Sequence, residues 1–138
     1  MCLYYINPYQ KKTKVKTAYK IMAWCGDGFF SGFKGATNGI NLKYVYPPNQ
    51  WVYYKSHEDS CSVGLYSFRS LKDAVSVYYE NSWNFVRNHK LVICSVRISD
   101  ILYEGTLLHD RYHSYISRKM KLLSVIEQSA YVFPNRTV

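Results

Sequence analysis

The stretch that decides the expected fold runs from Leu65 to Ala74 and reads LYSFRSLKDA. Its first four residues are typical of a strand. Ser70 and Asp73 then form the Ser-x-x-acid pattern of a helix start, because the serine oxygen accepts a backbone N–H and the acid lies at the positive helix end. Apolar residues follow at helical spacing, at Leu71, Ala74, Val75 and Tyr78. The pattern predicts a strand that leads directly into an amphipathic helix over residues 70–83.

Strands are expected on both sides of this step. Apolar and polar residues alternate over 17–25, and Gly26-Asp27-Gly28 then supplies a tight turn. Trp51 to Tyr54 forms a further short strand. Residues 91–99 place Val92, Cys94, Val96 and Ile98 on one face, so that Arg97 lies on the other, either solvated or in a site.

The C-terminal part is expected to end in one more strand. Glu104-Gly105 marks a turn within 100–108, the segment 110–117 is polar and aromatic, and residues 121–126 form the last strand. Strands, one good helix and strands again predict an α+β fold with a mostly antiparallel sheet and the helix on one face. We expect one domain over 17–138, preceded by a basic arm or edge strand over 1–16.

Composition places the chain among folded globular proteins. It has 138 residues, of which 48% are hydrophobic and 20% charged, well away from the signature of disorder. No apolar run reaches the roughly 18 residues of a membrane span, and the N-terminus lacks the charge order of a secretory signal. We expect a cytoplasmic protein that does not contact the membrane.

Neither a metal nor a cofactor is expected. The four cysteines, Cys2, Cys25, Cys61 and Cys94, form no CxxC pair, and the four histidines offer no partner pattern at zinc-ligand spacing. We interpret the cysteines as reduced thiols. No Ser, Cys or His stands in a context typical of a nucleophile and its base.

Net charge is the strongest compositional fact. The formal charge is +9, from 18 basic and 9 acidic residues. Such an excess attracts polyanions, including nucleic acids, nucleotides and acidic protein surfaces, although solubility alone could explain it.

The best candidate site is the basic segment 111–121. Arginine offers a planar fork for phosphate, lysine a mobile charge, and a tyrosine ring a stacking face for a base. A solvated loop before the last strand is the alternative interpretation. The candidate ligand-binding residues here are Arg111, Tyr112, His113, Tyr115, Arg118, Lys119 and Lys121.

Two further groups of cations are candidates. Arg69 and Lys72 flank the expected helix start, where free N–H groups and the helix dipole favour an anion. The lysine-rich stretch over 11–20 is interpreted as a polyanion arm, formed by Lys11, Lys12, Lys14 and Lys16.

Two short motifs are weaker signals. Gly26 to Gly32 has the wrong spacing for a dinucleotide loop and is followed by no helix, which favours a hairpin turn. Leu102-Tyr103-Glu104-Gly105-Thr106 resembles the Tyr-His-Gly-Thr element of some ADP-ribosyltransferases, with Glu104 at the histidine position.

A broader resemblance rests on the strand over 18–21, the step over 64–74, the strand over 92–96 and the basic segment before 122–126. This layout resembles a loose group of small phage, prophage and giant-virus proteins. The resemblance implies an anti-defence binding protein, an inhibitor or sponge, whose target is a signalling nucleotide, a guide RNA or a host immune effector. Separately, an edge strand over 1–6 or exposed aromatic residues could form a homo-oligomer.

We therefore expect a binding protein for an anionic ligand rather than an enzyme. Two alternatives stay open. One is a small enzyme that acts on nucleotides, either a phosphodiesterase or an ADP-ribosyltransferase-like protein. The other is a general RNA- or DNA-binding accessory protein.

Overall fold

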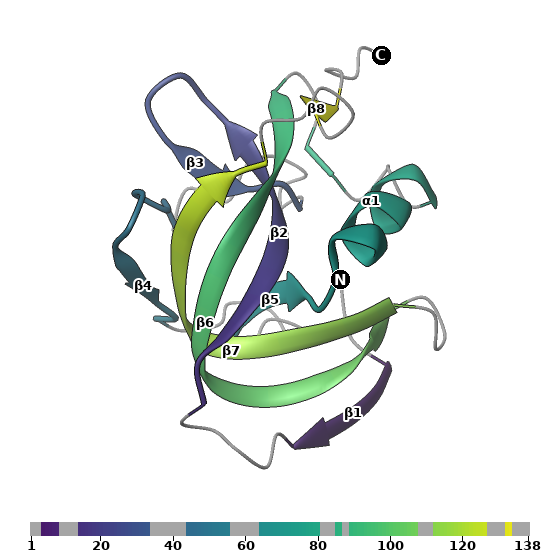
Figure 1. Ribbon diagram of the computed structural model, residues 1–138. Helices are drawn as coiled ribbons and strands as arrows, with labels where there is room; N and C mark the ends of the chain where they lie inside the picture. The colour runs from purple at the N-terminus through teal and green to yellow at the C-terminus, as the bar shows by residue number, and fades with distance from the viewer. Residues whose placement is uncertain are drawn as a thin grey trace.

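The structure of the protein, a computed structural model, describes residues 4–8, 14–33, 44–55, 64–80, 85–86, 89–107, 112–126 and 132–133. Figure 1 shows the elements in chain order: β1 (Tyr4–Pro8), β2 (Lys16–Trp24), β3 (Phe29–Ser31), β4 (Trp51–Tyr53), β5 (Leu65–Phe68), α1 (Leu71–Glu80), β6 (Lys90–Leu107), β7 (Tyr112–Val125) and β8 (Val132–Phe133).

The fold is nearly all β, so the expected α+β class with a main amphipathic helix is wrong. Every pair of named strands is antiparallel, and α1 has only ten residues. The error arose at segments 100–108 and 110–117, whose turn-like composition hid two strands. They pair with each other, for example Glu104 with Tyr115 and Gly105 with Ser114, so β6 and β7 form one long hairpin.

Four strands close into a ring. β6 pairs with both β2 and β7, and β5 pairs with the same two strands. The β2–β6 ladder is continuous from Lys16 opposite Ile98 to Trp24 opposite Lys90. In contrast, β2 and β5 are joined by a single register pair, Tyr19 with Phe68. β1 adds to β6 outside the ring, and β4 adds to β7.

Both long strands bend so that the ring can close. On β6, Val96 and Ile98 face the interior. Regular alternation would point Ile101 outward, but it also faces the interior, so the alternation changes at Asp100, which has a φ of 53°. β7 changes its alternation between Tyr115 and Met120, which both face the interior. Ser99 pairs with Lys119 and Ile101 with Ser117, so the two bends lie opposite each other. Figure 1 shows β6 and β7 turning together.

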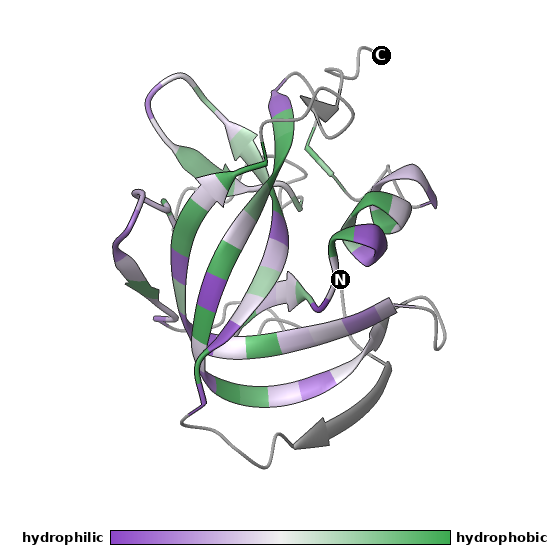
Figure 2. Ribbon diagram, in the orientation of Figure 1, coloured by the Kyte–Doolittle hydropathy of each residue, from purple (hydrophilic) through white to green (hydrophobic). Residues whose placement is uncertain are grey.

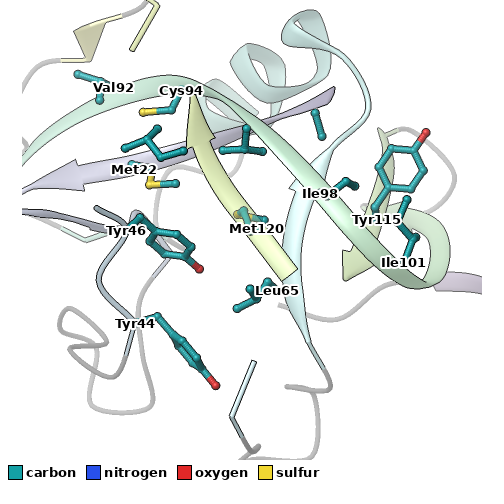
Figure 3. Packing of buried hydrophobic residues seen from close by; sticks show 13 residues of the cluster. Met22, Tyr44, Tyr46, Leu65, Val92, Cys94, Ile98, Ile101, Tyr115 and Met120 are labelled. Carbon is teal, nitrogen blue, oxygen red and sulfur yellow. The ribbon is translucent and has the colours of Figure 1, made fainter. Parts of the chain in front are cut away.

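The wall formed by β2 and β6 separates two regions of core. One cluster fills the ring and includes Met22, Cys94, Ile98 and Met120, whose side chains converge in Figure 3. The other packs α1 against the outside of β2 and β6, with Ile21, Ala23, Leu91 and Ile93 on the strands and Ala74, Val77 and Tyr78 on the helix. Figure 2 shows the hydrophobic and hydrophilic residues alternating along these strands. Both faces of β2 are therefore buried near its centre.

Local signals at the helix start and at the first hairpin are confirmed. The Ser70 hydroxyl accepts the backbone N–H of Asp73 at 3.1 Å, as the capping pattern predicts. Gly26 has a φ of 90°, and the N–H of Cys25 donates to the carbonyl of Gly28 at 3.1 Å, so this segment is a turn between β2 and β3.

The bend at Asp100 gives a stability prediction. A left-handed backbone suits glycine and strains a β-branched residue. Asp100→Gly should keep or raise the free energy of unfolding, whereas Asp100→Val should lower it by about 1–2 kcal/mol, as measured by urea denaturation. Ser99→Val places the same side chain on the preceding residue, which lacks this conformation, as the control. Equal losses in both valine variants would contradict the prediction.

Candidate functional site

Cations and aromatic side chains meet on the outside of the closed ring of strands. Trp51 of β4 lies opposite Lys121 of β7, which in turn lies opposite Arg97 of β6. Tyr53 lies opposite Lys119 in the next row. Directly opposed residues of antiparallel strands project from the same side of a sheet. We call these five residues, Trp51, Tyr53, Arg97, Lys119 and Lys121, the basic-aromatic face.

The position of this face follows from the register of β7. Met120 and Leu122 point into the ring core and are almost fully buried, so Lys119 and Lys121 must point outward. On β6 the buried Val96 and Ile98 direct Arg97 outward in the same way. The helix covers a different stretch of this outer surface, because its strand contacts include Ile21, Ala23, Leu91 and Ile93.

Each lysine of the face lies over a ring. The Lys121 Nζ is 4.8 Å from the centroid of the Trp51 ring, and the Lys119 Nζ is 5.5 Å from that of Tyr53. Such contacts at exposed positions contribute about 0.5–1 kcal/mol each. They hold the ammonium groups near the rings and leave them in reach of solvent, since both lysines are only partly buried and Tyr53 is 54% exposed.

The electrostatic character of the face is positive. Neither β4 nor β7 contains an aspartate or a glutamate. Arg97 is exposed, and Arg118 is exposed at the bend of β7, between Ser117 and Lys119, which pair with Ile101 and Ser99. An anion that reaches this surface therefore meets the mobile ammonium groups of Lys119 and Lys121 and the planar guanidinium group of Arg97. The guanidinium group of Arg118 lies beside them.

The structure divides the basic segment 111–121 into residues with different roles. Lys119 and Lys121 belong to the basic-aromatic face, and Arg118 lies beside it. Tyr112 and Tyr115 are buried at 7% and 2% exposure, so neither ring is a stacking platform. Arg111 lies outside the described residues. From Tyr112 onward the segment is a strand rather than the solvated loop that was the alternative.

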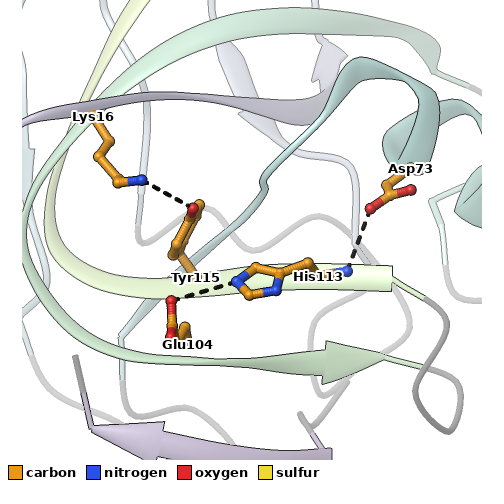
Figure 4. Close-up of polar contacts among 5 residues, drawn as sticks. All are labelled: Lys16, Asp73, Glu104, His113 and Tyr115. Carbon is orange, nitrogen blue, oxygen red and sulfur yellow. Dashed lines mark hydrogen bonds and ion pairs between the residues drawn. The ribbon is translucent and has the colours of Figure 1, made fainter.

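His113 and Tyr115 take part in a polar cluster at the end of the ring, shown in Figure 4. The His113 Nε2 is 3.5 Å from a Glu104 carboxylate oxygen, and the Lys16 ammonium donates to the Tyr115 hydroxyl at 3.3 Å. The backbone N–H of His113 donates to the Asp73 carboxylate at 3.3 Å. These contacts tie β2, β6, β7 and α1 together, and we interpret the cluster as structural.

The cations at the helix start do not join the basic-aromatic face. Arg69 and Lys72 are exposed, and the Arg69 N–H donates to the carbonyl of His113 at 3.1 Å. Arg118 is five residues further along β7, roughly 16 Å for an extended strand, and beyond the bend. The two groups are therefore separate.

The lysines of the expected polyanion arm have different environments. Lys11 and Lys12 lie outside the described residues, and Lys14 is exposed. Lys16 is the first residue of β2, where its ammonium contacts Tyr115, so it belongs to the ring rather than to an arm.

Sequence reasoning missed Trp51 and Tyr53 as candidate residues and left Arg97 undecided. Their signal is the alternation within the short strand 51–54, which places both rings on one side. Which cations they meet depends on long-range pairing, and no local pattern specifies it.

Lys20 is a buried cation in the lysine-rich stretch 11–20. Only 2% of it is exposed, and its ammonium donates to the Tyr66 carbonyl at 2.7 Å, between the rings of Phe33 and Tyr46. Burial lowers the pKa of Lys20 from 10.5 to about 7. Burial also raises the pKa of Cys94, opposite Lys20 on β6, to about 12, so its thiol is neutral. Lys20 therefore takes no part in an exposed basic surface.

Two candidate features are absent from the described part of the chain. It contains no group of three or more His, Cys, Asp or Glu side chains arranged to hold a metal ion. In the same residues, no helix has the length and apolar character needed to cross a membrane.

Comparison with protein-family models, with curated proteins and with solved structures finds no significant match to this chain.

Lys20 gives a pH-dependent prediction. Its pKa is lower in the folded protein, so the unfolded chain binds more protons between about pH 7 and pH 10.5, and stability due to Lys20 rises with pH over this window. Lys20→Met removes this dependence. The free energy of unfolding of the variant, relative to that of the wild type, should therefore be highest below about pH 7 and decrease by about 3–5 kcal/mol toward pH 10.5.

Urea denaturation of both proteins across this pH range measures the difference. Loss of the donor to the Tyr66 carbonyl costs the same at every pH, so only the slope is diagnostic. Parallel stability profiles for the two proteins would contradict the burial of a titrating amine.

Proposed function

We propose that this protein binds an anionic ligand, without chemical conversion, through the basic-aromatic face. The observation that carries the proposal is the group formed by the exposed Arg97 of β6 and the partly exposed Lys119 and Lys121 of β7, beside two aromatic rings of β4. The net charge of +9 supports it, because long-range attraction increases the rate of encounter with polyanions.

The shape and chemistry of this face support a phosphate-bearing ligand. An extended sheet surface presents its cations in rows rather than in a closed pocket. The lysines are mobile point charges, and the Arg97 guanidinium offers a planar fork to a phosphate oxygen pair. Nucleic acids combine phosphates with flat rings, and both features have partners here.

The resemblance to small viral proteins supports a biological setting for this binding. In that setting the protein acts in the cytoplasm of a host cell and sequesters a nucleic acid or nucleotide that host defence requires. The basic surface supports capture of the anionic component itself, or of an acidic patch on an effector protein, rather than mimicry of DNA.

Removal of two charges from the face tests the proposal. Lys119→Gln with Lys121→Gln should weaken binding to heparin and to a labelled oligonucleotide by about tenfold or more at low salt. The slope of log affinity against log salt should fall by about two, because about two phosphate contacts are lost.

A matched variant, Lys72→Gln with Lys90→Gln, removes the same charge from exposed positions on α1 and at the start of β6. It should change the affinity only slightly. Equal losses in the two double variants would mean that net charge, rather than this face, determines binding. Unchanged affinity in the Lys119/Lys121 variant would exclude the face.

A further inference from the structure

The two rings of the basic-aromatic face repeat along β4. Trp51 and Tyr53 are two residues apart on one strand, so they project from the same side at a spacing of roughly 7 Å. Each ring has its own lysine on the neighbouring strand, at 4.8 Å for Trp51 and 5.5 Å for Tyr53. The unit of one ring and one cation therefore occurs twice, in register.

A repeated pair of ring and cation matches a polymer that alternates flat bases with phosphates. In a duplex the base faces are stacked inside and cannot reach a protein ring, so a duplex would use only the cations. In a single strand, successive bases can stack on aromatic side chains while the backbone follows basic residues. The exposure of Tyr53, at 54%, leaves this ring accessible to a base.

We propose that the anionic ligand is single-stranded nucleic acid, whose adjacent bases stack on Trp51 and Tyr53 while its phosphates contact Lys119, Lys121 and Arg97. This inference rests on the proposed function and names the ligand class of the same face. DNA and RNA strands share this chemistry.

Binding exchanges the partners of the lysines. Without ligand, each ammonium lies over a ring that a base would occupy. A cation–aromatic contact at an exposed position is weaker than the stacking of a base on an aromatic side chain. A base therefore displaces the ammonium, which then reaches a phosphate through its flexible stem. Arg97, in the same row as Lys121 and Trp51, extends the positive track onto β6.

The test separates stacking from charge. The probes are a fluorescein-labelled oligothymidylate of about ten nucleotides, the oligouridylate of equal length, a duplex DNA of equal length, and heparin, a polyanion without bases. Fluorescence anisotropy gives the affinity for each labelled nucleic acid, and elution from a heparin column gives that for heparin. Trp51→Leu with Tyr53→Leu removes the rings, and Lys119→Gln with Lys121→Gln removes the charges.

We expect the wild type to bind at least one single strand more tightly than the duplex. The Trp51/Tyr53 variant should lose about tenfold to a hundredfold in affinity for that strand and little for heparin. The Lys119/Lys121 variant should lose affinity for every probe. In Trp51→Leu alone, the quenching of tryptophan fluorescence on binding should decrease. If the double variant does not fold, Tyr53→Leu alone provides the test, because this residue is exposed.

Three results would count against these proposals. If the ring variants bind single strands as the wild type does while the lysine variant loses affinity, stacking is excluded but the proposed function stands. If the duplex binds as tightly as both single strands, the ligand class is wrong. If the lysine variant also retains full affinity, the proposed function fails with it.

Discussion

Closure of the strand ring at β2 and β5 is the constraint on which the rest of the structure depends. The backbone ladder there consists of one register pair, Tyr19 with Phe68, and the Lys20 ammonium adds a hydrogen bond to the Tyr66 carbonyl at 2.7 Å. A buried amine is costly unless its hydrogen-bonding capacity is used. The hydrogen bond from Lys20 thus strengthens the contact between β2 and β5, where the backbone ladder is shortest. The enclosed core and the outward orientation of Lys119 and Lys121 on β7 both require a closed ring.

Much of the local structure could be predicted from the sequence. The capping pattern at Ser70 and Asp73 predicted the helix start, and the alternation around Val92 to Ile98 predicted a strand with Arg97 on the opposite face from these residues. The fold class could not be predicted in the same way. Gly105 and the polar residues near His113 favour turns locally, but their mutual pairing across the long hairpin stabilises strands.

The candidate site was only partly predictable for the same reason. Clustering of cations near Arg118 indicated a basic region, and Lys119 and Lys121 do lie on the proposed surface. Which tyrosines remain exposed depends on the register beyond the β7 bend, so Tyr112 and Tyr115 are in the core, whereas Tyr53 is outside. The burial of Lys20 follows from its position between Ala18 and Met22 on one strand face, since both of these are fully buried.

The order of strands in the ring has a consequence for how the chain folds. β2 is made early, but its longest ladder is with β6, and Lys16 meets Tyr115 across a sequence separation of 99 positions. Contacts of this kind are formed late, and proteins rich in them fold slowly. During synthesis, both apolar faces of β2 must remain without their final partners until most of the chain has left the ribosome. This interval exposes the nascent chain to aggregation and to chaperones.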